Sequence, residues 1–177
     1  MLGCLGRCLY YAHRYELQYD EAWTYNHFVA NGILVAMASP NNNHILYSVL
    51  ACFADWLPIE AKYSLRLPVI LGGLSLLLSA AWWWRRHWSW GWTLLALSWL
   101  AFCPGVSLYS LYARGYIFQQ LFTLWGLGLT LHLLKGARHK TAVWGAWSAS
   151  IVLGLWSVPT HAYVAVVLSG VLFVDGL

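Results

Sequence analysis

Apolar residues are arranged in two ways along this chain, and the arrangement changes near Leu65. Before Leu65 they alternate with polar and charged residues at helical spacing, whereas after it they form long runs separated by short polar or basic breaks. A helix that crosses the bilayer core of about 30 Å needs about 20 predominantly apolar residues. The pattern therefore predicts membrane-spanning helices from Leu65 onward and a different kind of structure before it.

The apolar runs predict a bundle of about five spans in residues 65–177. Pro104-Gly105 predicts a kink near the end of the second span, and Gly126-x-Gly128 in the third is expected to serve helix packing. The expected spans are 65–84, 90–109, 116–134, 142–157 and 162–177, the last of which the end of the chain cuts off.

Residues 1–64 predict an extracytoplasmic segment with two surface helices. Residues 1–19 are broken by Arg7 and other charges, so they predict neither a span nor a signal peptide. Residues 20–39 have a mixed helix-compatible face that Pro40 is expected to end. A second helix over 44–57, with asparagines 41–43 as N-cap candidates, has an apolar stripe formed by Ile45, Val49, Phe53 and Trp56.

The second of these helices is too short to be a span. Its roughly 14 residues rise about 21 Å as an α-helix, which is less than the core thickness. Both segments are therefore expected to be amphipathic juxtamembrane helices in the first outer loop. The predicted fold class is all-α, a polytopic membrane helical bundle that carries these two helices.

Composition supports the membrane class and excludes others. Hydrophobic residues make up 60% of the 177 residues and charged residues only 9%, against about 25% charged in soluble domains. The 13 tryptophans and 11 tyrosines are typical of membrane interfaces. A net charge of +4 without a basic patch gives no reason to expect nucleic acid as a partner. The four cysteines contain no C-x-x-C pair and are expected to be small buried hydrophobic residues.

The basic residues predict the orientation. Two basic breaks, 85–87 and 135–140, are separated by two predicted spans and must lie on one side, which the positive-inside rule makes cytoplasmic. The segment before Leu65 and the connections 109–116 and 157–162 then lie on the outer side. All carboxylates except Asp175 fall on that outer side.

The outer face carries an acidic pair, Asp20-Glu21, a polar turn at Asn43-His44, and two arginines, Arg66 and Arg114. Such a set suits sugar transfer from a lipid phosphate. A carboxylate takes the proton of the attacking hydroxyl, and cations stabilise the departing phosphate. The chain has no P-loop and no G-x-G-x-x-G pattern, which agrees with a donor that is not a nucleotide.

Three sequence segments also carry a family resemblance. Asp20-Glu21-Ala22-Trp23, then Ser64-Leu65-Arg66-Leu67-Pro68, then Tyr112-Ala113-Arg114-Gly115-Tyr116 resemble in order and spacing the GT-C glycosyltransferases. Within them the chain is most similar to the protein mannosyltransferase and aminoarabinose transferase superfamily. The resemblance covers most of residues 16–130. It implies an inverting transfer from a polyprenyl- or dolichyl-phosphate sugar to a hydroxyl of a lipid, glycan or protein acceptor, at the outer face of a bacterial inner membrane.

The resemblance also implies residue roles. Asp20 falls on the catalytic base and Glu21 on a supporting or metal-binding carboxylate. Asn43-His44 stands where the family often has a His-Pro-Pro-Leu-like turn, although both prolines are missing here. Arg114, and with less support Arg66, are the candidates for the lipid phosphate. No cofactor is expected, although the acidic pair could hold a divalent cation through its oxygens.

Two other interpretations stay open. A non-catalytic binding or transport protein would need polar groups within the spans, where Gln119, Gln120 and His132 are the main examples. The superfamily also places a span before the acidic pair and many spans after the segments matched here. The sequence is therefore expected to be the N-terminal part of such an enzyme. It could also be an inactive truncated product, or a subunit that a partner completes.

Overall fold

The computed structural model describes residues 2–38, 43–137 and 141–176, and there the chain forms helices joined by short turns and loops. No strand occurs within those ranges, so the predicted all-α class is confirmed. Two segments labelled η have π-helical geometry. In chain order the elements are α1 (Leu2–Arg14), α2 (Tyr19–Thr24), η1 (Tyr25–Val29), α3 (Ile33–Ala38), α4 (Ile45–Asp55), α5 (Ala61–Trp84), α6 (Trp90–Phe102), α7 (Pro104–Tyr109), α8 (Tyr116–His132), η2 (Leu133–Ala137), α9 (Thr141–Ser157) and α10 (His161–Gly176).

Two of the described helices are long and apolar enough to cross a membrane. They are α5, with 24 residues, and the stretch Tyr116–Gly136, with 21 residues, which correspond to about 36 Å and about 31 Å of helix. The two pack against each other. Gly72 permits this approach, because a Cβ there would lie only 2.9 Å from the ring of Phe118.

The other predicted spans are shorter helices. The run 90–109 is divided into α6 and α7 at Cys103, whose ψ of 128° is extended. The predicted kink is thus a complete break, because Pro104 disfavours a helical conformation at the residue before it. At 13 residues, α6 rises about 20 Å. Helices α9 and α10 have 17 and 16 residues, or about 26 Å and 24 Å.

Large apolar side chains remain exposed on the shorter helices α6 and α10. Contiguous apolar surface of this kind is unusual on a water-soluble monomer and marks contact with a membrane or a partner. The exposed residues include Leu94, Leu95, Trp99, Phe102, Tyr163, Val166, Val167, Phe173 and Val174. These faces are suited to a lipid environment.

The N-terminal part forms more helices than the two predicted. Residues 20–38 form α2, η1 and α3, and the chain turns before α3 at Gly32, whose φ of 87° favours a residue without a Cβ. Helix α4 follows the predicted amphipathic run. Its N-cap is His44 rather than an asparagine, and residues 39–42, which include Pro40 and two of the asparagines, lie outside the described ranges.

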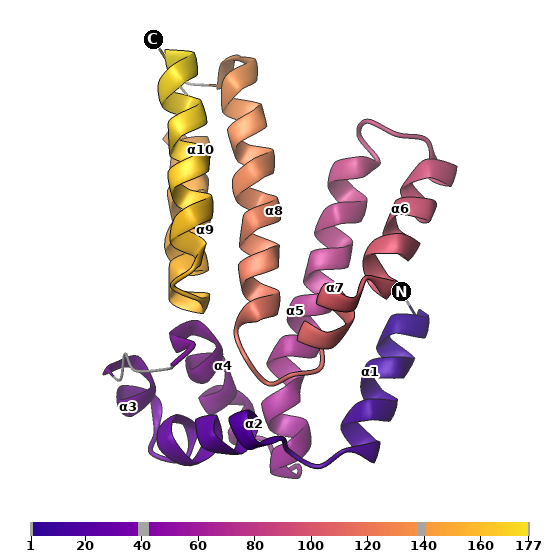
Figure 1. Ribbon diagram of the computed structural model, residues 1–177, viewed down its shortest axis with the longest axis vertical. Helices are drawn as coiled ribbons and strands as arrows, with labels where there is room; N and C mark the ends of the chain where they lie inside the picture. The colour runs from indigo at the N-terminus through magenta and orange to yellow at the C-terminus, as the bar shows by residue number, and fades with distance from the viewer. Residues whose placement is uncertain (1, 39–42, 138–140, 177) are drawn as a thin grey trace.

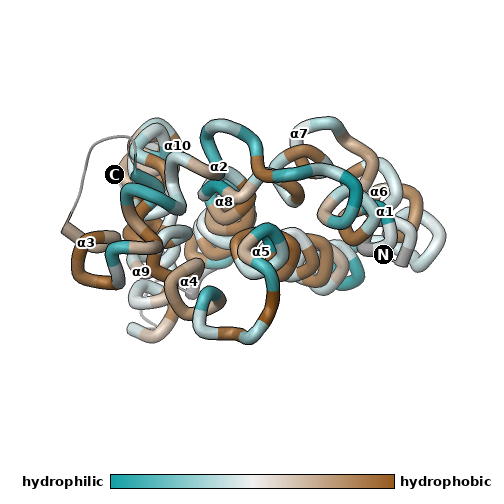
Figure 2. Tube along the Cα trace, turned by 90° about the horizontal axis from the view of Figure 1, so that it is seen from below, coloured by the Kyte–Doolittle hydropathy of each residue, from teal (hydrophilic) through white to brown (hydrophobic). Residues whose placement is uncertain are grey.

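The helices place the acidic segments and the basic breaks at opposite ends (Figure 1). Helices α2, α3 and α4 lie across one end of the long helices, whereas the α5–α6 connection and the end of α8 lie at the other. Figure 2 looks onto the α2–α4 end and shows hydrophilic stretches along α2 and at the start of α5. Residues 138–140 of the second basic break lie outside the described ranges.

Candidate functional site

The two adjacent carboxylates of α2 have very different surroundings. Asp20 and Glu21 both lie in the first turn of α2, but successive helical residues point about 100° apart. The Asp20 side chain is 63% exposed and that of Glu21 only 1%. The pair is therefore one surface carboxylate and one buried carboxylate.

Glu21 is held by four hydrogen bonds. Arg66 donates Nε–H to Oε1 at 3.1 Å and Nη2–H to Oε2 at 2.8 Å, which is a bidentate ion pair. The backbone N–H of Ala113 donates to Oε1 at 2.9 Å and that of Gln18 to Oε2 at 2.8 Å. An ionised carboxylate has about four acceptor positions, so donors of the protein itself occupy all of those of Glu21.

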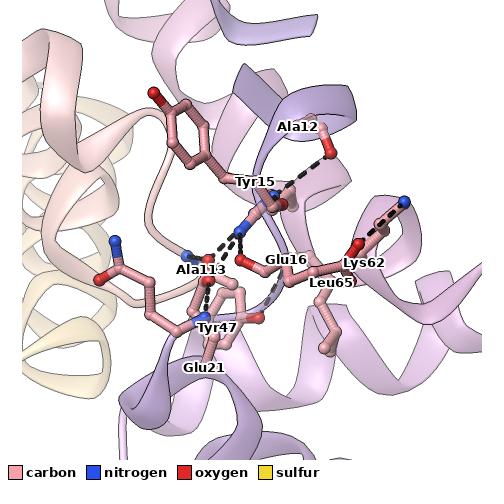
Figure 3. Close-up of polar contacts among 10 residues, drawn as sticks. Ala12, Tyr15, Glu16, Glu21, Tyr47, Lys62, Leu65 and Ala113 are labelled. Carbon is pink, nitrogen blue, oxygen red and sulfur yellow. Dashed lines mark hydrogen bonds and ion pairs between the residues drawn. The ribbon is translucent and has the colours of Figure 1, made fainter. Parts of the chain in front are cut away.

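The guanidinium of Arg66 also donates to backbone carbonyls within the protein. Its Nη1 donates to the carbonyls of Ala12 at 3.3 Å and Tyr15 at 2.7 Å, and its Nη2 to that of Glu16 at 2.9 Å. Figure 3 shows these bonds converging from the α1–α2 connection and the start of α5, with Ala113 on the other side of Glu21. We refer to Glu21 and Arg66 as the buried clamp.

The buried clamp differs from what the resemblance implies for its two residues. Glu21 was expected to support catalysis or bind a metal, and Arg66 to bind a lipid phosphate. In the structure both side chains are buried and bound to each other and to backbone groups, and Arg66 also lines a groove formed by α1, α5 and α7. Among the described residues no group of three His, Cys, Asp or Glu side chains is placed to hold a metal ion.

Asp20 forms an ion pair with Arg114 at the protein surface. Arg114 Nη1 lies 3.0 Å from Asp20 Oδ2. The arginine side chain is only 8% exposed, whereas the aspartate is largely exposed. A buried cation thus fixes the position of a carboxylate that solvent or a ligand can reach.

His44 lies next to this ion pair and is neutral at pH 7. Its Nδ1 is 2.9 Å from the carbonyl oxygen of Ser157, which can only accept, so Nδ1 carries the hydrogen and Nε2 is the unprotonated nitrogen. Burial lowers the pKa of His44 to about 4; the Ser157 bond and the charge of Asp20 raise it, and the charge of Arg114 lowers it. Arg114, which pairs with Asp20, directly precedes Gly115, which lies against His44, so the three side chains form one cluster.

Gly115 allows His44 to approach the loop that carries Arg114. A Cβ at Gly115 would overlap the Ser157 carbonyl oxygen and lie 2.9 Å from Cβ of His44. The imidazole also contacts the ring of Tyr116 edge-on, with centroids 4.8 Å apart. The segment Tyr112–Tyr116 therefore meets both the α4 N-terminus and the end of α9.

Asn43, the residue before His44, makes buried hydrogen bonds within the fold. Its Nδ2 donates to the carbonyl of Ala36 at 2.6 Å, and its Oδ1 accepts from the Ser48 hydroxyl at 2.6 Å. Both bonds are buried, and they tie α3 to α4. Nothing in these contacts turns the amide toward a ligand.

The structure brings together three of the six predicted site residues, Asp20, His44 and Arg114. It places Glu21, Arg66 and Asn43 in the supporting framework. Sequence reasoning missed Tyr47, a fully buried side chain whose hydroxyl donates to the Leu65 carbonyl at 3.0 Å. A tyrosine within an apolar stripe gives no signal of this role in the sequence.

His161 is not among the predicted site residues; it is fully buried, and its two ring nitrogens have no hydrogen-bond partner. In the sequence it is a single histidine next to a proline turn, with no motif around it. Gly154 packs directly against its imidazole, since a Cβ at that position would overlap the ring. His161 lies at the start of α10, in the same α9–α10 turn region that supplies the Ser157 carbonyl to His44.

Comparison with known proteins identifies no relative of this chain. No protein-family model, no curated protein and no solved structure matches the chain.

Proposed function

We propose that the chain is part of a GT-C type membrane glycosyltransferase, and that Asp20, Arg114 and His44 belong to its transfer site. One observation carries the proposal: a buried arginine holds an exposed carboxylate beside a neutral histidine, at one end of two helices of bilayer length. General base, counter-charge and hydrogen-bond acceptor are the groups that transfer from a lipid phosphate requires.

In the proposed reaction, the acceptor hydroxyl oxygen attacks the anomeric carbon of the lipid-phosphate sugar. The bond from that carbon to the phosphate oxygen breaks with inversion, and its electron pair leaves with the lipid phosphate. The hydroxyl proton passes to Asp20. As Asp20 becomes neutral the leaving phosphate gains one negative charge, so Arg114 exchanges one anionic partner for another. The molecule that receives the sugar donates a hydrogen bond to Nε2 of His44.

The proposed arrangement in the membrane follows from the two ends of the molecule. Helices α5 to α10 would supply the spans of a multi-pass protein in a bacterial inner membrane, with α1–α4 at the outer face. Arg85–His87 and Lys135 lie at the end opposite α2, which is the cytoplasmic end under the positive-inside rule. The exposure of large apolar side chains on α6 and α10 supports this placement.

The experiment that tests the proposal is transfer by the full-length protein in vesicles. The donor is a polyprenyl-phosphate hexose labelled in the sugar, and both transfer to membrane acceptors and release of sugar to water are measured. Asp20→Asn is expected to lower turnover by about 100-fold or more. The matched control is Glu16→Gln, which removes one charge from a side chain that is 87% exposed.

Full turnover by Asp20→Asn, in protein that elutes and unfolds like the wild type, contradicts the proposal. Solute uptake by the reconstituted protein that is insensitive to Asp20→Asn would instead favour a transport function. Arg114→Lys provides a second test, because it keeps the charge and loses the planar guanidinium. It is expected to reduce turnover less than Asp20→Asn does.

A further inference from the structure

A groove of about 360 Å³ lies between α5 and α8, at the end of the molecule opposite α2. Its walls are the end of α5 with the turn that follows, and the second half of α8 with η2. Toward this end the two helices diverge (Figure 1). In a membrane that these two helices cross, the groove lies where the apolar core meets water. We refer to it as the α5–α8 groove.

Both walls of the α5–α8 groove change from apolar to basic in the same direction. On the α8 side three leucines precede Lys135, and on the α5 side Trp83 and Trp84 precede Arg86. The leucines are Leu124, Leu127 and Leu131. An apolar track that ends in basic side chains matches a phospholipid, whose acyl chains end at a phosphate in the headgroup layer.

The apolar part of the groove is built by packed helices. Trp83 lies against α8 because Gly128 has no side chain, and a Cβ at Gly128 would overlap the indole ring. Next to it Trp82 stacks on Trp125, with ring centroids 5.8 Å apart, and the Trp125 indole N–H donates to Ser79 Oγ at 3.1 Å. These contacts fix the end of α5 against α8, so the groove exists before a ligand enters.

Arg86 is the cation best placed to bind an anion in the groove. Its guanidinium carbon lies 3.7 Å from the centre of the Trp82 ring, and stacking of this kind leaves the N–H donors at the edge of the guanidinium plane available. Among the described residues Arg86 forms no ion pair. Its neighbour Arg85 does not line the groove, because it donates to the Trp88 carbonyl at 2.7 Å and lies over the Trp90 ring.

The charges and the volume of the groove suit an anionic phospholipid. Arg86 and Lys135 are both cations, and no carboxylate is among the described residues that line the groove. One water occupies about 30 Å³ of the liquid, so there is room for about twelve waters, enough for a phosphoglycerol headgroup and the first carbons of its chains. A soluble phosphate would leave the leucines uncovered, and a choline headgroup would bring a further cation to the basic rim.

We propose that the α5–α8 groove binds an anionic phospholipid of the phosphatidylglycerol type, with its phosphate at Arg86 and Lys135 and an acyl chain along the three leucines. Basic pockets between membrane-spanning helices bind anionic headgroups in this way. The bound lipid contacts both helices and stabilises their packing. The proposal requires that α5 and α8 enter a membrane, but it does not depend on sugar transfer, whose proposed residues lie at the opposite end.

The test is the binding of phosphatidylglycerol with a pyrene-labelled acyl chain to the full-length protein in a neutral detergent. Binding is measured by energy transfer from the tryptophans to the pyrene. The competitors are unlabelled phosphatidylglycerol, phosphatidylcholine and inorganic phosphate. Phosphatidylglycerol is expected to compete at least about tenfold better than the other two, because it alone combines a net negative headgroup with acyl chains.

Two adjacent arginines provide the variant and its control. Arg86→Gln is expected to weaken phosphatidylglycerol binding about fivefold, through the loss of one basic contact. Arg85→Gln removes the same charge one residue away, outside the groove, and is expected to change the affinity less than about twofold. A neutral detergent has no anionic surface, so attraction of basic residues to a charged membrane does not contribute to either value.

Three results would overturn the inference: equal competition by phosphatidylcholine, competition by inorganic phosphate as strong as that by phosphatidylglycerol, or equal losses in the Arg85→Gln and Arg86→Gln proteins. If Arg86→Gln does not fold, Lys135→Gln takes its place with the same expected loss, and wild-type affinity overturns the inference. Asp20→Asn is expected to bind phosphatidylglycerol like the wild type, whatever its effect on transfer. Failure of the groove and failure of the proposed function therefore give different results.

Discussion

Replacing Glu21 by Gln is expected to destabilise the protein strongly. The change keeps the shape of the side chain but removes the charge that balances Arg66 and one of the two acceptor oxygens that now serve four donors. Leaving one member of a buried ion pair without its partner costs about 3–5 kcal/mol. In a chain of this length each kcal/mol lowers the unfolding temperature by about 2–4 °C, so the expected shift is roughly 6–20 °C.

The assay is thermal unfolding in detergent, followed by tryptophan fluorescence. Glu16→Gln is the matched control, because Glu16 is 87% exposed and pairs with Lys62 at 3.5 Å. Exposed pairs contribute about 0–1 kcal/mol, so its unfolding temperature should change by no more than about 4 °C. Equal shifts for the two variants would refute the argument that burial gives the Glu21–Arg66 pair its importance.

Two further predictions concern the contacts around His44. Gly115→Ala places a Cβ against the Ser157 carbonyl and is expected to cost about 1–3 kcal/mol, whereas Gly91→Ala, with no atom within 4 Å, should stabilise α6 slightly; thermal unfolding of both variants checks this. The lowered pKa of His44, about 4 against 6.5, means that the unfolded chain binds more protons between these values. Stability from this group is present above pH 6.5 and is lost as pH falls toward 4. Unfolding temperatures measured across that range should depend less on pH in His44→Gln, and an unchanged dependence contradicts the assigned cause.

The helical fold could be predicted because hydrophobic pattern and length determine it. The run beginning at Leu65 has no charge until Arg85 except Arg66, and the helix that forms there ends at Trp84. The break at Cys103 was less visible, because the composition of 90–109 is uniformly apolar and only Pro104 marks the end of α6. The backbone restriction that Pro104 places on Cys103 ends the helix there, although all of 90–109 has the hydrophobic pattern of one span.

The candidate site could be predicted only as a set of residue types. Asp20 and Glu21 are equivalent in a sequence, and so are Arg66 and Arg114. The ion pairs that distinguish them join residues 45 positions apart in one case, Glu21 with Arg66, and 94 in the other, Asp20 with Arg114. Which partner each carboxylate finds depends on how α2 packs against α5 and the Tyr112–Tyr116 segment. Periodicity along a single helix contains no information about that packing.

The Tyr112–Tyr116 segment connects the buried clamp with the Asp20–Arg114 ion pair and His44. Tyr112 lines a groove formed by α1, α5 and α7, the Ala113 N–H donates to Glu21, Arg114 pairs with Asp20, and Gly115 lies against His44. Because Ala113 is fixed by a buried carboxylate, its neighbours on either side cannot move far independently. Glu21, by fixing Ala113, therefore positions Arg114, the arginine that pairs with Asp20. Under the proposed function, Asp20 meets the substrate, whereas Glu21 acts only through this positioning.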